Sequence, residues 1–258
     1  MKTIILCGGA GTRLREETEF KPKPMVLIGN KPIIWHIMKY FSTFGYNEFI
    51  LALGYKADYV KDFFLNQKAF TSDFTLDTSN HKTVFYLENR SNVDNFKITF
   101  VDTGLHTLPG ERILMCEKYI PKNDKYFMVT YGDGVTDIKI DDLIKFHKKQ
   151  KTIGTISGIH PRFKYGVTKT DNDNFVTDFN EKPVLSDWVN GGYMIFDKRF
   201  FGYIKPGETE HNALKRLSNK KQLSLYKHEG FWFAVDTNKE LDELNQLWNA
   251  GNPPWKKW

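Results

Sequence analysis

Apolar positions in the first part of the chain form short continuous runs that alternate with amphipathic stretches. Continuous apolar runs predict buried strands, and apolar residues at every third or fourth position predict helices. The predicted strands are residues 3–7, 48–53, 97–104 and 126–134, and the predicted helices are residues 32–45, 57–67, 111–120 and 141–150. Strands that alternate with helices in this way favour an α/β fold with a mainly parallel sheet.

The pattern changes at about residue 152, where short strands follow one another with few helices between them. These predicted strands are residues 152–159, 166–170, 175–181, 188–196, 222–228 and 230–237, and the later helices are residues 211–219 and 238–249. No linker rich in proline, glycine or serine separates the two patterns, so we expect a single domain, residues 1–258, with halves 1–150 and 151–258. Residues 68–95 are polar and irregular, and they predict no element.

Composition places the chain among ordinary globular proteins, with 40% hydrophobic and 26% charged residues in 258. A net charge of +6 fits either a polyanionic partner or solubility alone. Two cysteines do not make a disulfide framework, and no apolar stretch has the length of a membrane helix. The first apolar run ends at Gly8 and is too short for a signal peptide. We therefore expect a cytoplasmic protein that neither enters a membrane nor carries a leader.

Glycines and basic residues are concentrated in "LCGGAGTRLREETEFKPKPM", which begins at residue 6 directly after an apolar strand. The segment does not match the Walker A loop, because Thr12 and Arg13 follow Gly11. It does not match the dinucleotide fingerprint either, because Leu14 stands where a third small residue is needed. Exposed backbone N–H groups and the charges of Arg13 and Lys23 predict a site for phosphate groups. The alternative is a tight turn with solvated charges.

Two aspartates follow apolar strands, Asp133 in "YGDG" and Asp236 in "FAVDT". Ligands of open α/β sheets sit at the carboxyl ends of strands, and paired carboxylates there suit Mg²⁺. Each aspartate is alternatively a cap for the next element, and Asp236 precedes a predicted helix.

Polar residues that suit a sugar phosphate occur in "NEKP" and "VNGG". Glu181 and Asn190 supply partners for neighbouring hydroxyl groups, and Lys182 suits a phosphate. The alternative is a β-turn at the first segment and a glycine-containing bulge in the second.

Taken in order, the segments "LCGGAGTRLREET", "KPKPM", "TYGDGV", "FNEKP", "VNGGYMIF", "GFWFAVDT" and "PPWKKW" resemble the sugar-phosphate nucleotidyltransferases. The resemblance runs nearly from end to end and is strongest in the glycine-rich segment. The "EET" after the arginine, "KPKPM" and the C-terminal tail are most similar to the branch that transfers cytidylyl groups to glucose 1-phosphate. The resemblance implies a Rossmann-like, mainly parallel mixed sheet flanked by helices, an architecture similar to that of glycosyltransferases of type A.

The resemblance also implies a reaction, in which CTP and α-D-glucose 1-phosphate give CDP-glucose and pyrophosphate. The nucleotide-binding residues that it implies, in half 1–150, are Leu6, Cys7, Gly8, Gly9, Ala10, Gly11, Thr12, Arg13, Lys23, Thr107, Arg112 and Gly132. The implied sugar-phosphate residues, in half 151–258, are Gly166, Glu181, Lys182, Asn190 and Gly191. Catalytic roles fall to Arg13, Lys23, Asp133 and Asp236, and the two aspartates would hold Mg²⁺. Members of the family are usually homo-oligomers, here a trimer or a hexamer.

Other functions remain open at this point. UTP or dTTP, or another phosphorylated sugar, fits the same chemistry. A regulatory subunit without catalysis is disfavoured, because Arg13, Lys23, Asp133, Lys182 and Asp236 are all present. A nucleic-acid-binding protein is disfavoured because the chain carries no basic–aromatic motif of the kind found in RNA-recognition domains.

Overall fold

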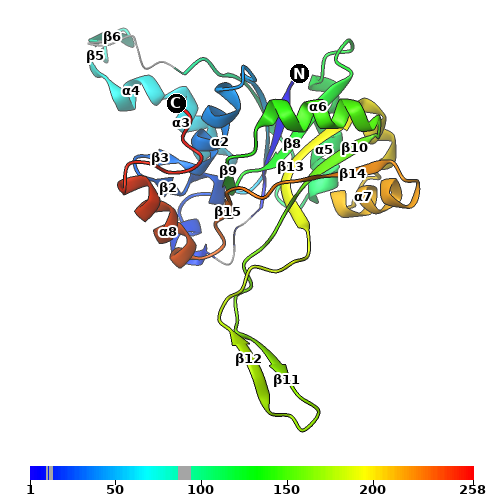
Figure 1. The fold of residues 1–258 in the computed structure, drawn as a ribbon. Helices are drawn as coiled ribbons and strands as arrows, with labels where there is room; N and C mark the ends of the chain where they lie inside the picture. Colours follow the sequence, from blue (N-terminus) through cyan, green and yellow to red (C-terminus); the bar gives the residue numbers. More distant parts are fainter. Residues whose placement is uncertain (10, 12–13, 87–93) are drawn as a thin grey trace.

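Seven strands form the central sheet of the structure, a computed structural model that describes residues 1–9, 11, 14–86 and 94–258. The strands lie in the order β14-β10-β13-β8-β1-β4-β7 (Figure 1). Neighbouring strands are parallel except where β13 pairs with β10 and with β8. Their bounds are β1 (Thr3–Cys7), β4 (Glu48–Leu53), β7 (Lys97–Asp102), β8 (Tyr126–Tyr131), β10 (Gly154–Ile159), β13 (Val189–Asp197) and β14 (Leu223–Lys227). The predicted mainly parallel mixed sheet is confirmed.

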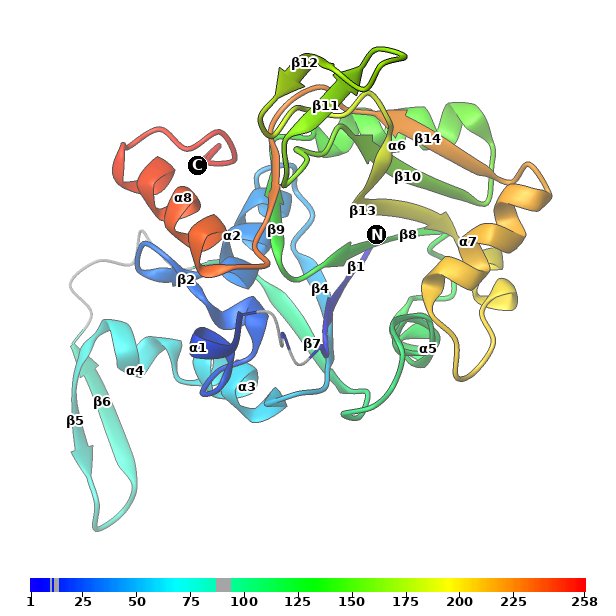
Figure 2. The ribbon, with the colours of Figure 1, turned by 90° about the horizontal axis from the view of Figure 1, so that it is seen from below.

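Two hydrophobic cores lie on opposite faces of this sheet, because successive side chains of a strand point to opposite sides. Ile5 belongs to one core and Ile4 to the other, and both are fully buried. Helices cover both faces (Figure 2). Those that pack on the core of Ile5 are α2 (Ile33–Ser42), α3 (Ala57–Leu65), α6 (Ile140–Gln150) and α8 (Asn238–Asn249). Those that pack on the core of Ile4 are α5 (Pro109–Met115) and α7 (Glu210–Asn219).

Shorter elements connect the sheet and the helices. They are α1 (Arg15–Thr18), α4 (Gln67–Thr71) and the 3-10 helices η2 (Lys23–Met25), η4 (Glu117–Tyr119) and η5 (Lys198–Tyr203). Two small antiparallel pairs lie beside the site described below, β2 (Leu27–Ile28) with β3 (Lys31–Pro32) and β9 (Gly134–Thr136) with β15 (Trp232–Ala234). The helix predicted over 111–120 divides into α5 and η4, whereas the other predicted helices differ from the structure mainly at their ends.

Two hairpins project from the body of the molecule (Figure 1). One consists of β5 (Asp73–Asp77) and β6 (Lys82–Tyr86), within the segment for which the sequence predicts no element. The other consists of β11 (Val167–Thr170) and β12 (Val176–Asn180), and we call residues 160–188, which include it, the arm. Large apolar side chains of both hairpins are exposed, among them Phe74 and Phe179. Neither hairpin adds to the two cores.

Within the described ranges, no helix has the combination of length and apolar character that crossing a membrane requires.

Candidate active site

A cavity of about 310 Å³ opens at the carboxyl ends of β1 and β8, in the middle of the central sheet. This is where ligands bind in open α/β sheets. Most of its wall comes from residues that the sequence predicts for nucleotide binding. The described lining residues are Leu6, Cys7, Gly8, Gly9, Gly11, Lys23, Pro24, Pro109, Arg112, Tyr131, Gly132, Asp133 and Asp236.

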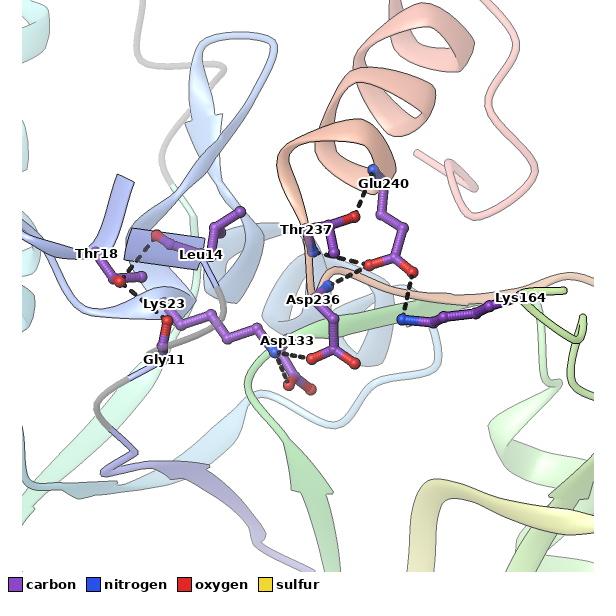
Figure 3. A network of polar contacts seen from close by, with 9 residues as sticks. All are labelled: Gly11, Leu14, Thr18, Lys23, Asp133, Lys164, Asp236, Thr237 and Glu240. Atoms are coloured by element: carbon purple, nitrogen blue, oxygen red, sulfur yellow. Dashed lines mark hydrogen bonds and ion pairs between the residues drawn. The ribbon is translucent and has the colours of Figure 1, made fainter. Parts of the chain in front are cut away.

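Three charged groups meet at this cavity, Lys23, Asp133 and Asp236 (Figure 3). The Nζ atom of Lys23 lies 2.7 Å from Oδ2 of Asp133 and 2.8 Å from Oδ1 of Asp236. The ammonium side chain is 14% exposed, and the two carboxylate side chains are 31% and 32% exposed. A partly buried cation thus bridges two carboxylates that remain accessible from the cavity.

Strand pairing outside the central sheet brings the two aspartates together. Asp133 stands two residues after β8, and Asp236 stands two residues after β15. Because β15 pairs with β9 in antiparallel register, Val135 lies opposite Phe233, and the backbone N–H of Val235 donates to the carbonyl of Asp133 over 2.9 Å. Two carboxylates that are far apart in the chain are therefore fixed at one end of the sheet.

Lys23 remains a cation at this place. Burial lowers the pKa of Lys23. The charge of Asp133 and the hydrogen bonds to Asp133 and Asp236 raise this pKa by more than burial lowers it, so the net change is upward. Its backbone is set by η2, where Pro22 is extended and the N–H of Val26 donates to the carbonyl of Lys23. A fixed positive charge in the wall of the cavity suits a polyanionic ligand.

The arrangement also fits a divalent cation. Asp133 and Asp236 converge on a single cationic point, the Nζ atom of Lys23. No group of three or more histidine, cysteine, aspartate or glutamate side chains among the described residues forms a metal site, so the protein offers two carboxylates. Mg²⁺ is commonly held in that way, by one or two carboxylates together with water and substrate phosphates. The donor set thus matches magnesium with a bound nucleotide.

The glycine-rich loop after β1 forms another part of the cavity wall. Gly11 has a φ of +63°, which favours glycine, and its carbonyl accepts hydrogen bonds from the N–H of Leu14 and the hydroxyl of Thr18, both over 3.0 Å. Gly8, Gly9 and Gly11 line the cavity as predicted. The predicted residues Ala10, Thr12 and Arg13 lie outside the part of the chain that the structure describes.

Comparison with known proteins gives the family. The family model described as nucleotidyl transferase matches residues 2–248. The chain belongs to the nucleotidyl transferase family. It is 41% identical over 261 residues to the probable glucose-1-phosphate cytidylyltransferase of Bacillus subtilis (strain 168), and 37% identical to the glucose-1-phosphate cytidylyltransferase of Salmonella typhi. Both alignments cover the whole of each chain.

Solved structures share the fold of this nucleotidyl transferase. A putative glucose-1-phosphate thymidylyltransferase from Bacillus anthracis superimposes with a TM-score of 0.66 at 20% identity, over 96% of this chain and 94% of the other. A UDP-glucose pyrophosphorylase superimposes with a TM-score of 0.69 at 17% identity, over 96% of this chain and 98% of the other. At this level of identity the likeness supports the architecture alone.

Arg112 lies in the wall of the nucleotidyl transferase cavity, yet its guanidinium is directed at the protein itself. The side chain is 4% exposed and donates to four carbonyl oxygens and one hydroxyl. The acceptors are the carbonyls of Leu53, Gly8, Gly104 and Leu105 and the hydroxyl of Thr103. Arg112 therefore joins the loop after β1 to the loop after β7, and it fixes the shape of this part of the cavity wall.

Two other predicted nucleotide residues have different positions. Gly132 lines the cavity, and a Cβ atom there would lie 2.9 Å from Pro24 and 3.0 Å from the carbonyl of Leu6, so only glycine fits without a shift. Thr107 is half-buried beside Gly104 and is not among the cavity-lining residues.

The structure divides the predicted sugar-phosphate residues into two groups. Asn190 and Gly191 lie on β13, which pairs with β8, the strand that ends at Tyr131 in the cavity wall. Gly166, Glu181 and Lys182 lie on the arm, where a Cβ at Gly166 would be 3.0 Å from the carboxylate of Glu181. Glu181 and Lys182 are exposed, their charges are 3.7 Å apart, and neither lines the cavity.

Glu240 was not identified in the sequence analysis, and its carboxylate binds the backbone N–H groups of Asp236 and Thr237. Its Oε2 accepts from the N–H groups of Asp236, over 2.7 Å, and Thr237, over 2.9 Å (Figure 3). The Thr237 hydroxyl accepts from the N–H of Glu240, which completes a capping box. Thr237 rather than Asp236 is thus the N-cap of α8. The spacing of threonine and glutamate, three residues apart, was the available signal.

Lys164 was also missed, and it connects the arm to this cap. Its Nζ lies 3.3 Å from Oε1 of Glu240 (Figure 3). The network therefore runs from the arm through Glu240 and the backbone of Asp236 to Lys23. No motif marks Lys164, because its partner is distant in sequence.

Proposed function

We propose that this nucleotidyl transferase transfers a cytidylyl group from CTP to α-D-glucose 1-phosphate and gives CDP-glucose and pyrophosphate. The observation that carries the proposal is the convergence of Lys23, Asp133 and Asp236 on the cavity. Full-length identity to proteins named glucose-1-phosphate cytidylyltransferase supports the choice of both substrates.

The reaction needs no covalent enzyme intermediate. A phosphate oxygen of glucose 1-phosphate attacks the α-phosphorus of CTP, the new P–O bond forms, and the bond to the bridging oxygen breaks so that pyrophosphate leaves with the electron pair. The attacking phosphate is ionised at neutral pH, so no general base is required. Catalysis then consists of positioning and charge neutralisation. When bound by Asp133 and Asp236, Mg²⁺ supplies part of that neutralisation.

We assign the remaining roles as follows. Lys23 holds the triphosphate with a point charge, and Arg13 contributes a bidentate fork. The backbone of the loop from Leu6 to Gly11, with Gly132, receives the nucleotide, and Arg112 fixes the shape of that loop. Residues 1–150 form the nucleotide half and residues 151–258 the sugar-phosphate half of a single domain. The latter binds sugar phosphate through Gly166, Glu181, Lys182, Asn190 and Gly191.

Assembly and location belong to the same proposal. We expect a homo-oligomer, a trimer or hexamer, because the arm exposes large apolar side chains that include Tyr165, Phe175 and Phe179. We expect a cytoplasmic enzyme, because Cys7 and Cys116 are buried and unpaired thiols. No nucleic-acid or membrane partner is part of the proposal.

Pyrophosphate release tests the function directly. The purified protein is mixed with Mg²⁺, glucose 1-phosphate and CTP, UTP, dTTP, ATP or GTP in separate reactions. Release with CTP alone is expected. Release with UTP or dTTP instead would keep the chemistry and reject the base, and release only with another sugar 1-phosphate would reject glucose. No release with any pair would reject the proposal.

A further inference from the structure

Tyr131 is the only aromatic residue among the described residues that line the cavity. It ends β8, which lies between β1, the strand of the glycine-rich loop, and β13, the strand of Asn190. In the register of the sheet Tyr131 lies opposite Leu6. The residue therefore stands at the boundary between the nucleotide half and the sugar-phosphate half.

The ring of Tyr131 lies against β13 at Gly192. A Cβ atom at Gly192 would lie 2.4 Å from Cδ2 of the ring, so a larger residue there would displace the tyrosine. Gly192 has a φ of +81°, which also favours glycine. The N–H of Gly192 donates to the side-chain oxygen of Asn190 over 2.9 Å. The backbone of β13 is thus shaped around this ring.

The hydroxyl of Tyr131 is held by a buried carboxylate. It donates to Oε1 of Glu210 over 2.6 Å, and Glu210 is 3% exposed. Burial, and next the charge of Glu210, raise the pKa of Tyr131, so the hydroxyl remains a donor. The other oxygen, Oε2, is buried and has no hydrogen-bond partner among the described residues. A buried carboxylate oxygen without a partner lowers the stability of the fold, so the presence of Glu210 at this position needs an explanation.

Glu210 is itself fixed by the helices behind the cavity. It begins α7, whose apolar residues Ala213, Leu214 and Leu217 lie in a hydrophobic core. The backbone before it rests on α5, where a Cβ at Gly110 would lie 2.6 Å from the carbonyl of Glu208. The backbone that carries Glu210 is therefore fixed, and its carboxylate can hold Tyr131 in one orientation.

We propose that Tyr131 contacts the hexose of the sugar phosphate with its ring, and that Glu210 is the residue that positions Tyr131 for this contact. The C–H faces of a hexose pack well on aromatic rings, and binding cavities commonly combine such a ring with a few polar groups. Phosphates instead need the donors that the glycine-rich loop and Lys23 provide. The inference rests on the proposed function, because it takes a hexose 1-phosphate as the second substrate.

Four variants test the pair, with Tyr40→Phe as the matched control. Tyr40 also has a buried hydroxyl, which donates to the carbonyl of Ile138 over 2.9 Å, but it lies outside the cavity. Tyr131→Phe removes the bond to Glu210, Tyr131→Leu removes the ring, Glu210→Ala removes the acceptor, and Glu210→Gln keeps an acceptor oxygen.

The KM for glucose 1-phosphate should rise roughly three- to tenfold in Tyr131→Phe and Glu210→Ala, the scale of one buried hydrogen bond. It should rise further in Tyr131→Leu and less in Glu210→Gln, whereas the KM for CTP should stay within about twofold. The double variant Tyr131→Phe/Glu210→Ala should add nothing to the single ones, because the two residues act as a unit. Equal changes in both KM values, additive effects, or the same change in Tyr40→Phe would overturn the inference.

Calorimetry separates this inference from the proposed reaction. CDP-glucose and CTP are titrated into each variant, since only the former carries a hexose. Weaker binding of CDP-glucose with unchanged binding of CTP in Tyr131→Leu supports the contact, even if turnover were to require another nucleotide. Equal affinities of the wild type and Tyr131→Leu for CDP-glucose would overturn the contact while leaving the reaction intact. If Glu210→Ala does not fold, Tyr131→Phe and Tyr131→Leu still decide.

Discussion

Lys23 and Asp133 lie 110 positions apart in the chain, yet the ammonium nitrogen of the first is 2.7 Å from a carboxylate oxygen of the second. The pair exists because η2 and the carboxyl end of β8 meet at the cavity in the middle of the central sheet. With Asp236 it forms a small charge cluster in which one cation serves two anions. The cluster leaves one net negative charge beside the fixed cation. A divalent cation held by the two carboxylates would turn this into a net positive charge, which suits a triphosphate.

Asp133→Asn and Asp236→Asn should each lower kcat about a hundredfold or more, because each removes one carboxylate from the cation site. An asparagine oxygen still accepts a hydrogen bond from Lys23, so the fold should be retained. The check is pyrophosphate release together with circular dichroism. Asp142→Asn is the control, because it removes a carboxylate from α6, where Asp142 lies 3.4 Å from Lys145 on the surface. Normal turnover in either site variant would remove that aspartate from the metal site.

Gly8→Ala should destabilise the protein by about 2–4 kcal/mol, because it disturbs a buried cation and its hydrogen bonds. A Cβ atom at Gly8 would lie 2.1 Å from the guanidinium carbon of Arg112, which has to leave its carbonyl partners. The neighbouring Gly9 has nothing within 4 Å of its Cβ position, so Gly9→Ala is the control for stability. Urea unfolding of both variants measures the difference. Similar urea midpoints for Gly8→Ala and Gly9→Ala would mean that the Arg112 side chain adopts another conformation without loss of stability.

The sequence predicted the central strands because they are buried on both faces. Residues 3–7 and 48–53 therefore read as continuous apolar runs, which are distinctive. The hairpin of β5 and β6 escaped prediction for the opposite reason. Its residues are almost all exposed, so no buried face imposes an alternation of apolar and polar positions.

The candidate site was predictable where a residue comes soon after a strand or belongs to a motif. Asp133 and Asp236 were found in that way, and they do meet at the cavity. The inward role of Arg112 was not predictable, because most of its partners are backbone carbonyls, which any residue supplies. The bond between Tyr131 and Glu210 joins residues 79 positions apart and leaves no local pattern.

The free energy of unfolding should fall as the pH drops from about 6.5 to 5, by about 2 kcal/mol for each buried neutral histidine. Burial lowers the pKa of His36 to about 4, and the unfolded chain therefore takes up a proton that the folded protein excludes. The ring is fully buried, with Nε2 placed 3.0 Å from the carbonyl of Ile28 and Nδ1 accepting from Trp255. Burial likewise lowers the pKa of His147 to about 4.

The matched variant for this pH dependence is His36→Gln, compared with the wild type by urea unfolding at pH 7.5, 6.5, 5.5 and 5.0. The variant should be less stable at every pH. Its free energy of unfolding should change less steeply with pH, because it lacks the contribution of one histidine. The loss should level off below about pH 4, where the folded protein also binds the proton. Identical slopes for the two proteins would contradict the neutral state of His36.

Glu240→Ala should cost about 1 kcal/mol of stability, the usual effect of losing a helix cap, and it should lower kcat several-fold. The reason is the position of its carboxylate, which holds the N–H of Asp236 over 2.7 Å and so fixes the backbone of a site residue. Glu240→Gln keeps an acceptor for that bond but loses the ion pair with Lys164, so its stability and kcat should fall less than those of Glu240→Ala.

Lys164→Gln should resemble Glu240→Gln, because both remove the same ion pair. Lys169→Gln is the control, since the partner of Lys169 is Asp178 within the hairpin of the arm, 3.5 Å away. Turnover with CTP and glucose 1-phosphate and thermal unfolding are measured for all four variants. Wild-type turnover in Glu240→Ala would show that the cap stabilises α8 without positioning Asp236.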